Sequence, residues 1–102
     1  MGYIEPEAAS KVLAQPDAAA IVGAAAGALA SLEPWTAAAA EEALRALPER
    51  LGAKPKAVFQ AVRVAVTGSV VSLPLFESLA LLGRERTLAR LREAETVAGK
   101  LG

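Results

Sequence analysis

Apolar side chains recur every three or four residues along most of this chain, which is the spacing of one face of an α-helix. Val22, Leu29 and Leu32 share such a face, and a second apolar stripe runs through residues 88–101. Alanine, the best helix former, makes up about a quarter of the sequence. The pattern therefore predicts an all-α protein, although the β-branched residues within 62–66 would by themselves also suit a strand.

Caps and helix-breaking residues divide this pattern into about six helices, which we expect to form a compact bundle or cage. The expected spans are approximately 6–14, 18–32, 37–51, 55–66, 73–82 and 84–101. The expected N-caps, whose side chains can accept hydrogen bonds from free backbone N–H groups, are Asp17, Thr36 and Ser72. The expected helix stops are the glycines Gly52, Gly68 and Gly83. Because the turn at Gly83 brings the last two helices together, we expect one apolar cluster of Leu75, Phe76, Leu79, Leu82, Leu88 and Leu91.

Length and composition limit the functions that this chain can have. A length of 102 residues is that of one domain, which we place at residues 1–102. The sequence has no cysteine, so it can form neither a disulfide nor a thiolate metal site. It also has no histidine, which is the commonest general base in enzymes. We therefore expect no catalytic residue, no metal and no cofactor. The longest apolar stretch, residues 18–32, is short for a membrane span and consists mostly of alanine and glycine, so we expect a cytoplasmic monomer without a membrane partner.

The net charge is zero, but the charges are unevenly distributed. Residues 1–49 carry two basic and seven acidic side chains, a balance of −5, whereas residues 50–92 carry eight basic and two acidic ones, a balance of +6. A basic second half suggests a surface for an anionic partner. Solvated charges on an ordinary helical protein would give the same pattern, and the balance falls short of the strongly basic one expected of an autonomous nucleic-acid-binding protein.

One segment is more specific than the rest of the chain, the run RVAVTGSVVSLPLFESLALLGRERTLARLR at residues 63–92. It resembles the C-terminal anticodon-binding region of bacterial glutamyl-tRNA synthetases, in which an Arg-Val-Ala-x-Thr-Gly segment precedes Val-Ser-Pro-Pro-Leu-Phe-Glu-x-Leu-x-Leu-Leu-Gly-Arg. The matching residues are Arg63, Val64, Ala65, Thr67, Gly68, Val71, Ser72, Pro74, Leu75, Phe76, Glu77, Leu79, Leu81, Leu82, Gly83 and Arg84. Weaker matches upstream extend the resemblance over most of the chain.

The resemblance implies a helical cage that binds a tRNA anticodon loop. Proteins recognise such RNA through unstacked single-stranded bases. By the resemblance, Arg63, Ser72, Leu73 and Leu75 contact the second and third anticodon bases. We expect the later arginines to contact the RNA backbone, and these are Arg84, Arg86 and Arg90. Each has an ordinary alternative: Arg63 can pair with Glu77, Ser72 can serve only as a cap, and the later arginines can be solvated.

Two functions remain open. In the family, aminoacylation belongs to a separate catalytic domain with a His-containing signature, which this chain lacks, so the chain by itself is expected to be a non-catalytic RNA-binding domain. The chain also departs from the family pattern, since Leu73 and Ala61 each stand where the family usually has proline. These changes, with the high alanine content, are also typical of an engineered or standalone helical scaffold that binds a different ligand or protein.

Overall fold

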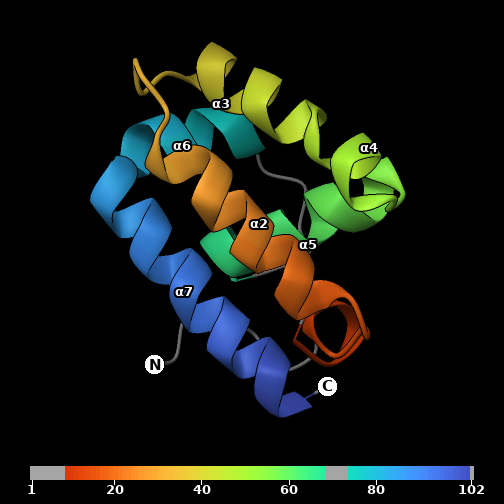
Figure 1. Ribbon diagram of the computed structural model, residues 1–102. Coiled ribbons are helices and arrows are strands. Elements are labelled where there is room, and N and C mark those ends of the chain that lie inside the picture. The colour runs from red at the N-terminus through yellow and green to blue at the C-terminus, as the bar shows by residue number, and fades with distance from the viewer. Residues whose placement is uncertain (1–8, 69–73, 102) are drawn as a thin grey trace.

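A computed structural model of the chain describes residues 9–68 and 74–101 (Figure 1). The described residues form one π-helical turn and six α-helices and contain no β-strand, which confirms the all-α prediction. The elements are η1 (Ala9–Leu13), α2 (Ala18–Ala30), α3 (Ala37–Arg45), α4 (Leu47–Leu51), α5 (Pro55–Thr67), α6 (Leu75–Leu82) and α7 (Arg84–Leu101).

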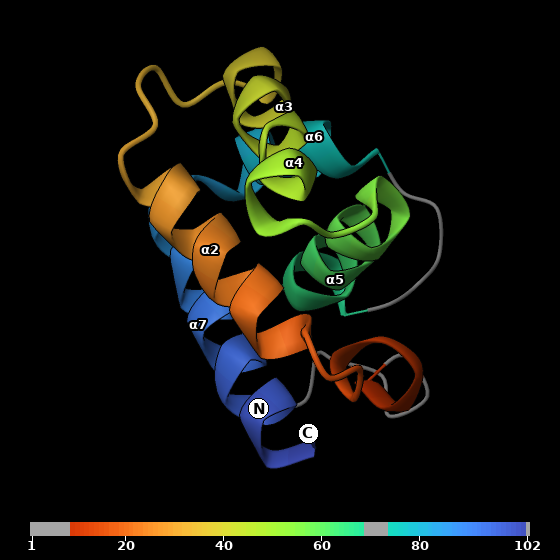
Figure 2. The same ribbon diagram turned by 45° about the vertical axis from the view of Figure 1, so that its right-hand side comes forward.

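The longest packing interface joins α2 and α7, which lie side by side in both views (Figures 1 and 2). Helix α5 packs against both of them, and α3 packs against α6 at one end of the bundle. The core between these helices is almost entirely apolar. Its largest fully buried side chains are Leu13, Leu29, Leu44, Leu47, Leu79, Leu91, Val22, Val58, Val62, Val64, Val66 and Thr87.

Several helix ends lie where the sequence predicts them. The Thr36 hydroxyl accepts a hydrogen bond from the backbone N–H of Ala39 at 3.1 Å, so Thr36 caps α3 as expected. Asp17 occupies the N-cap position of α2, but its side chain makes no capping hydrogen bond. Gly52, Gly68 and Gly83 end their helices with φ angles of 65°, 80° and 86°, a region that side chains with a Cβ rarely adopt.

Several predicted helices have different bounds in the structure. In its described part, the α-helix expected at 6–14 is a π-helical turn at Ala9–Leu13, and the helix expected at 18–32 ends at Ala30. The helix expected at 37–51 breaks at Ala46 into α3 and α4. Pro48 stands in the first turn of α4, where its missing N–H costs nothing, whereas inside one long helix it would remove a backbone hydrogen bond. The helix expected to begin at residue 73 begins instead at Leu75, with Pro74 in extended conformation at its N-cap. Ser72, the expected cap, lies outside the described residues.

The predicted cluster around the Gly83 turn is present. Leu75, Leu79 and Leu91 are buried in the core, and the other three members pack against it while partly buried: Phe76, Leu82 and Leu88. Within the described part of the chain, none of the helices is both long and apolar enough to cross a membrane.

A polar clasp holds the end of α2 against α6 and α7. The indole N–H of Trp35 donates to the carbonyl of Leu79 at 2.9 Å. The guanidinium of Arg84 lies 5.6 Å from the centre of the Trp35 ring and also donates to the carbonyl of Leu32. Trp35 therefore closes the bundle beside the turn that follows α2, as a cation–π partner and a hydrogen-bond donor together.

Candidate nucleic-acid interface

The candidate site is built on the exposed face of α5. Lys56, Gln60, Arg63 and Thr67 are spaced by four, three and four residues, so they lie above one another on one side of the helix. The opposite side of α5 is buried in the core. This division fixes Arg63 at the surface, and its side chain is half-buried there.

A pocket of about 320 Å³ opens beside Arg63, between α3, α5 and α6. Its walls combine two arginines with apolar and aromatic side chains, and its lining residues are Arg45, Phe59, Arg63, Pro74, Leu75 and Phe76. The rings of Phe59 and Phe76 meet edge to face, with centres 6.0 Å apart and planes at 90°. The structure thus places Arg63 and the nearly buried Leu75, two of the candidate RNA contacts, in the lining of one pocket and supplies aromatic surface next to them.

The charge of Arg63 is not neutralised within the described residues. Its Nε is buried without a hydrogen-bond partner, and no ion pair joins it to Glu77 among the described residues. The simple structural alternative, an Arg63–Glu77 pair, is therefore absent. A buried, unpartnered guanidinium nitrogen is costly unless a ligand or water supplies an acceptor, so Arg63 is prepared to donate to an anionic or polar ligand.

Arg45 is a second cationic residue of the pocket that the sequence alone did not identify. Its Nε donates to the carboxylate of Glu41 at 2.7 Å, one helical turn earlier on α3. The pair is exposed, so it is weak and easily rearranged. Arg45 belongs to the acidic half of the sequence, and only the packing of α3 against α6 and of α4 against α5 places it near Arg63. Phe59 is different, because it lies four residues before Arg63 on α5 and helical spacing alone places the two side chains next to each other.

Two further pockets adjoin the first one and share its walls. One of about 250 Å³ includes Pro74, Leu75 and Phe76 and extends to the start of α3. The other, of about 460 Å³, includes Arg45 and Phe59 and extends along α4. We call these three adjoining pockets the α5–α6 trough. Its three pockets draw their walls from α3, α4, α5 and α6, which suits a ligand that extends beyond a single small group.

The remaining predicted site residues are elsewhere or outside the described residues. Ser72 and Leu73 are among the residues that the structure does not describe. Arg84 belongs to the Trp35 clasp, and Arg90 donates through Nη1 to the carbonyl of Val66 at 2.6 Å. The carbonyl of Val66 lies in the last turn of α5, where carbonyl groups lack partners within the helix. Arg86 is exposed. RNA contact by these three arginines stays a prediction.

Metal chemistry has no support in the described residues. Among residues 9–68 and 74–101, no three acidic, histidine or cysteine side chains gather closely enough to hold a metal ion. The pocket beside Arg63 offers two guanidinium groups, apolar carbon and aromatic edges, whereas the two adjoining pockets of the trough also contain the carboxylates of Glu41, Glu49 and Glu77. The pocket beside Arg63 is therefore the part of the trough suited to a planar ligand with an anionic or polar edge, such as a nucleic-acid base with its phosphate.

Comparison with known proteins gives the family. The family model described as an anticodon binding domain matches residues 2–95. The chain belongs to the anticodon binding domain family.

Curated relatives give the setting in which the domain occurs. The chain is 56% identical over 96 residues to a glutamate–tRNA ligase of Acidothermus cellulolyticus, a match that covers 93% of this chain and 19% of the ligase. It is 53% identical to the ligase of Mycobacterium tuberculosis and 52% identical to that of Rhodococcus jostii, each match covering 94% of this chain and 20% of the relative. The chain therefore spans about a fifth of the length of the curated relatives that it matches.

Proposed function

We propose that this chain binds the anticodon loop of a tRNA as one non-catalytic domain, residues 1–102, in the manner of the anticodon-binding part of a glutamate–tRNA ligase. The observation that carries the proposal is the pocket beside Arg63, where an Arg63 whose Nε has no hydrogen-bond partner among the described residues lies beside Leu75 and an aromatic pair. Family membership supports the same ligand.

The residues of the trough have separable tasks in this proposal. An unstacked loop base rests mainly on the half-buried ring of Phe76, with the nearly buried Leu75 behind it, and base–aromatic stacking is typically worth about 1–3 kcal/mol per base. Arg63 donates to the edge of that base or to its phosphate through the fork of its guanidinium group. Arg45 exchanges its weak pair with Glu41 for a phosphate oxygen. Ser72 and Leu73, on the segment before α6, contact the neighbouring base.

The domain selects a tRNA and leaves the chemistry to another part of a ligase. A glutamate-accepting tRNA is the substrate that the relatives' name suggests, and the cytoplasm is where a monomeric domain of this kind would meet it. DNA and membranes are not partners in this proposal. The alternative, an engineered or standalone scaffold for a different ligand or protein, is favoured by no observation on the described residues.

A binding titration tests the proposal. The chain is titrated with the anticodon stem-loop of a glutamate tRNA and, separately, with a stem-loop of scrambled loop sequence. We expect preference for the first RNA, and Arg63→Ala should reduce that preference by about 1–3 kcal/mol, by analogy with bidentate base recognition. Arg50→Ala is the control, because Arg50 is exposed on α4 and lines none of the pockets of the trough. Equal affinity of the unmodified chain for both RNAs would contradict the proposal.

A further inference from the structure

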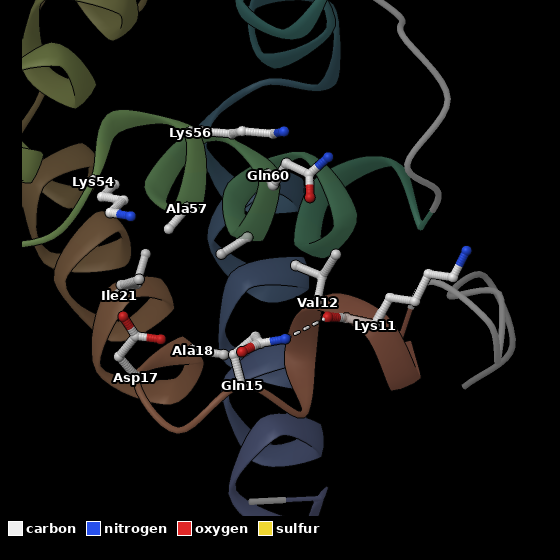
Figure 3. A pocket seen from close by; sticks show the side chains of 11 residues that line it. Lys11, Val12, Gln15, Asp17, Ala18, Ile21, Lys54, Lys56, Ala57 and Gln60 are labelled. Atoms are coloured by element: carbon white, nitrogen blue, oxygen red, sulfur yellow. Dashed lines mark hydrogen bonds between the residues drawn. The ribbon is translucent and has the colours of Figure 1, made fainter.

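A second pocket, of about 330 Å³, lies on the other side of α5 from the trough, between η1, the start of α2 and the start of α5 (Figure 3). Lys11, Lys54 and Lys56 stand around its rim on three sides, and Gln60 lies between two of them. Asp17 is the one acidic residue in its lining. We call this the lysine pocket.

The lysine pocket carries an excess of positive charge, with three lysines against the one carboxylate of Asp17. None of its three lysines forms an ion pair within residues 9–68 and 74–101, although Asp17 lines the same pocket. The first turn of α5 also contains no acidic side chain, and no side chain caps it. Three cations drawn from two separate segments of a chain with zero net charge are a local concentration that an anion would relieve.

The lysine pocket and the trough are connected by the exposed face of α5. Lys56, Gln60 and Arg63 lie on that face, with Lys56 and Gln60 lining one pocket and Arg63 the other. The stretch of helix from Lys56 to Arg63 spans about 10 Å along the helix axis. A single strand that places a base beside Arg63 can therefore cross α5 and reach the lysines without leaving the surface.

We propose that the lysine pocket binds a phosphodiester of the same RNA strand whose base enters the trough. This inference rests on the proposed function and adds a subsite to it. Lysine ammonium groups bind phosphate as point charges, without reading a base edge. The subsite therefore contributes affinity and fixes the direction in which the strand crosses α5, while the trough supplies the sequence preference.

The test compares two double variants that remove the same charge. Lys54→Gln with Lys56→Gln removes two positive charges from the lysine pocket, whereas Arg92→Gln with Lys100→Gln removes two exposed positive charges from α7, outside the pocket. Affinities for the anticodon stem-loop and the scrambled stem-loop are measured over a series of salt concentrations. Circular dichroism confirms that both variants keep their helices.

The expected result is a change in salt dependence that is confined to the pocket variant. When a lysine no longer neutralises a phosphate of a single strand, the slope of log affinity against log salt becomes shallower by about 0.7. The pocket variant should therefore have a slope shallower by about 1.4 and an affinity about 25-fold weaker near 0.1 M salt. Both RNAs should weaken equally, because phosphate contacts carry no sequence information. The α7 variant should keep a slope close to that of the unmodified chain.

Two results would overturn the proposal. Equal slopes for the two double variants would show that the lysines contact no phosphate, even if the preference for the anticodon loop is intact. Amide resonances of Lys56 and Ala57 that shift with inorganic phosphate but not with the stem-loop would assign the pocket to a free anion. Absence of loop preference in the unmodified chain, with the slope change present, would instead contradict the proposed function alone, so the two failures are distinguishable.

Discussion

The α2–α7 pair and the region around the trough use different side chains for different purposes. Where α2 meets α7, the buried residues include Ala25 and Ala26 on one helix and Ala94 and Ala98 on the other. Small side chains allow the two helix backbones to approach closely, and their contact is the most extensive in the bundle. All three aromatic residues within the described part of the chain lie instead around α3, α5 and α6: Trp35, Phe59 and Phe76.

This difference explains where binding chemistry can occur. Alanine faces can fit closely together, and none of the four pockets described above is lined by a residue of α7. Bulky rings and guanidinium groups fill space less completely, and the α5–α6 trough lies among them. In the proposed function, the α2–α7 pair therefore supports the fold, and the region around α3, α5 and α6 receives the base.

The largest expected effect comes from the apolar core that α7 shares with its neighbours. Leu91 on α7 is fully buried, so Leu91→Ala should lower the free energy of unfolding by about 2–5 kcal/mol, which is much of the stability of a small domain. Leu81→Ala is the matched control, because Leu81 is 89% exposed and should change stability by less than about 0.5 kcal/mol. Urea unfolding followed by circular dichroism measures both. Similar values for the two variants would refute this description of the core.

The second prediction asks whether Arg90, which the sequence predicts to bind RNA, instead contributes mainly to the stability of the fold. Arg90→Ala removes the charged hydrogen bond to the carbonyl of Val66, which should cost about 1.5–3 kcal/mol of stability. Arg92→Ala, two residues further on and exposed, should cost little. Thermal unfolding of the two variants gives the stability difference. An Arg90 variant that keeps full stability but binds all RNAs more weakly would restore a purely RNA-binding role.

A substitution at Phe76 can distinguish the contribution of its ring to core packing from its proposed contribution to base binding. Phe76→Leu keeps an apolar side chain against the core, so its cost in stability should stay below about 1.5 kcal/mol. Removal of the ring should weaken binding of both the anticodon and the scrambled stem-loop by about 1–3 kcal/mol, since stacking tolerates any base. Titration of both RNAs, with unfolding measured in parallel, checks this. Unchanged affinity for both would remove Phe76 from the proposed base-binding wall.

The smallest expected changes in stability come from replacing two glycines by alanine, one inside a helix and one at a positive φ angle. Gly27 is exposed within α2, and a Cβ added there would meet no atom within 4 Å, so Gly27→Ala should stabilise the fold by about 0.5–1 kcal/mol. Gly52 has equally open surroundings but a φ of 65°, so Gly52→Ala should destabilise it by about 1–2 kcal/mol. Opposite shifts in melting temperature are the expected readout. Shifts of the same sign would be inconsistent with this account of the two positions.

The sequence by itself determined the helical content, most helix ends and the family resemblance. Thr36 caps its own helix through a residue three positions away, and the glycines at 52, 68 and 83 end theirs through their own backbone angles. These features could be predicted because they depend on interactions within about one helical turn. The break at Ala46 depends on a comparably local feature, the preference of Pro48 for a first helical turn, which the spacing of apolar residues does not reveal.

Only the tertiary structure decided which polar residues meet. Arg84 donates to Leu32 across 52 residues of sequence and Arg90 to Val66 across 24, which gives two of the predicted RNA-binding arginines partners inside the protein. Arg45 joins Arg63 in one pocket only because of how α3, α5 and α6 pack, whereas Phe59 lies one helical turn before Arg63 on α5 itself. Periodicity states which face of a helix is exposed, but the angle and register at which helices pack depend on side-chain shapes across the whole core. For that reason the sequence indicated Arg63 and Leu75, and the packing of the helices supplied the rest of the candidate site.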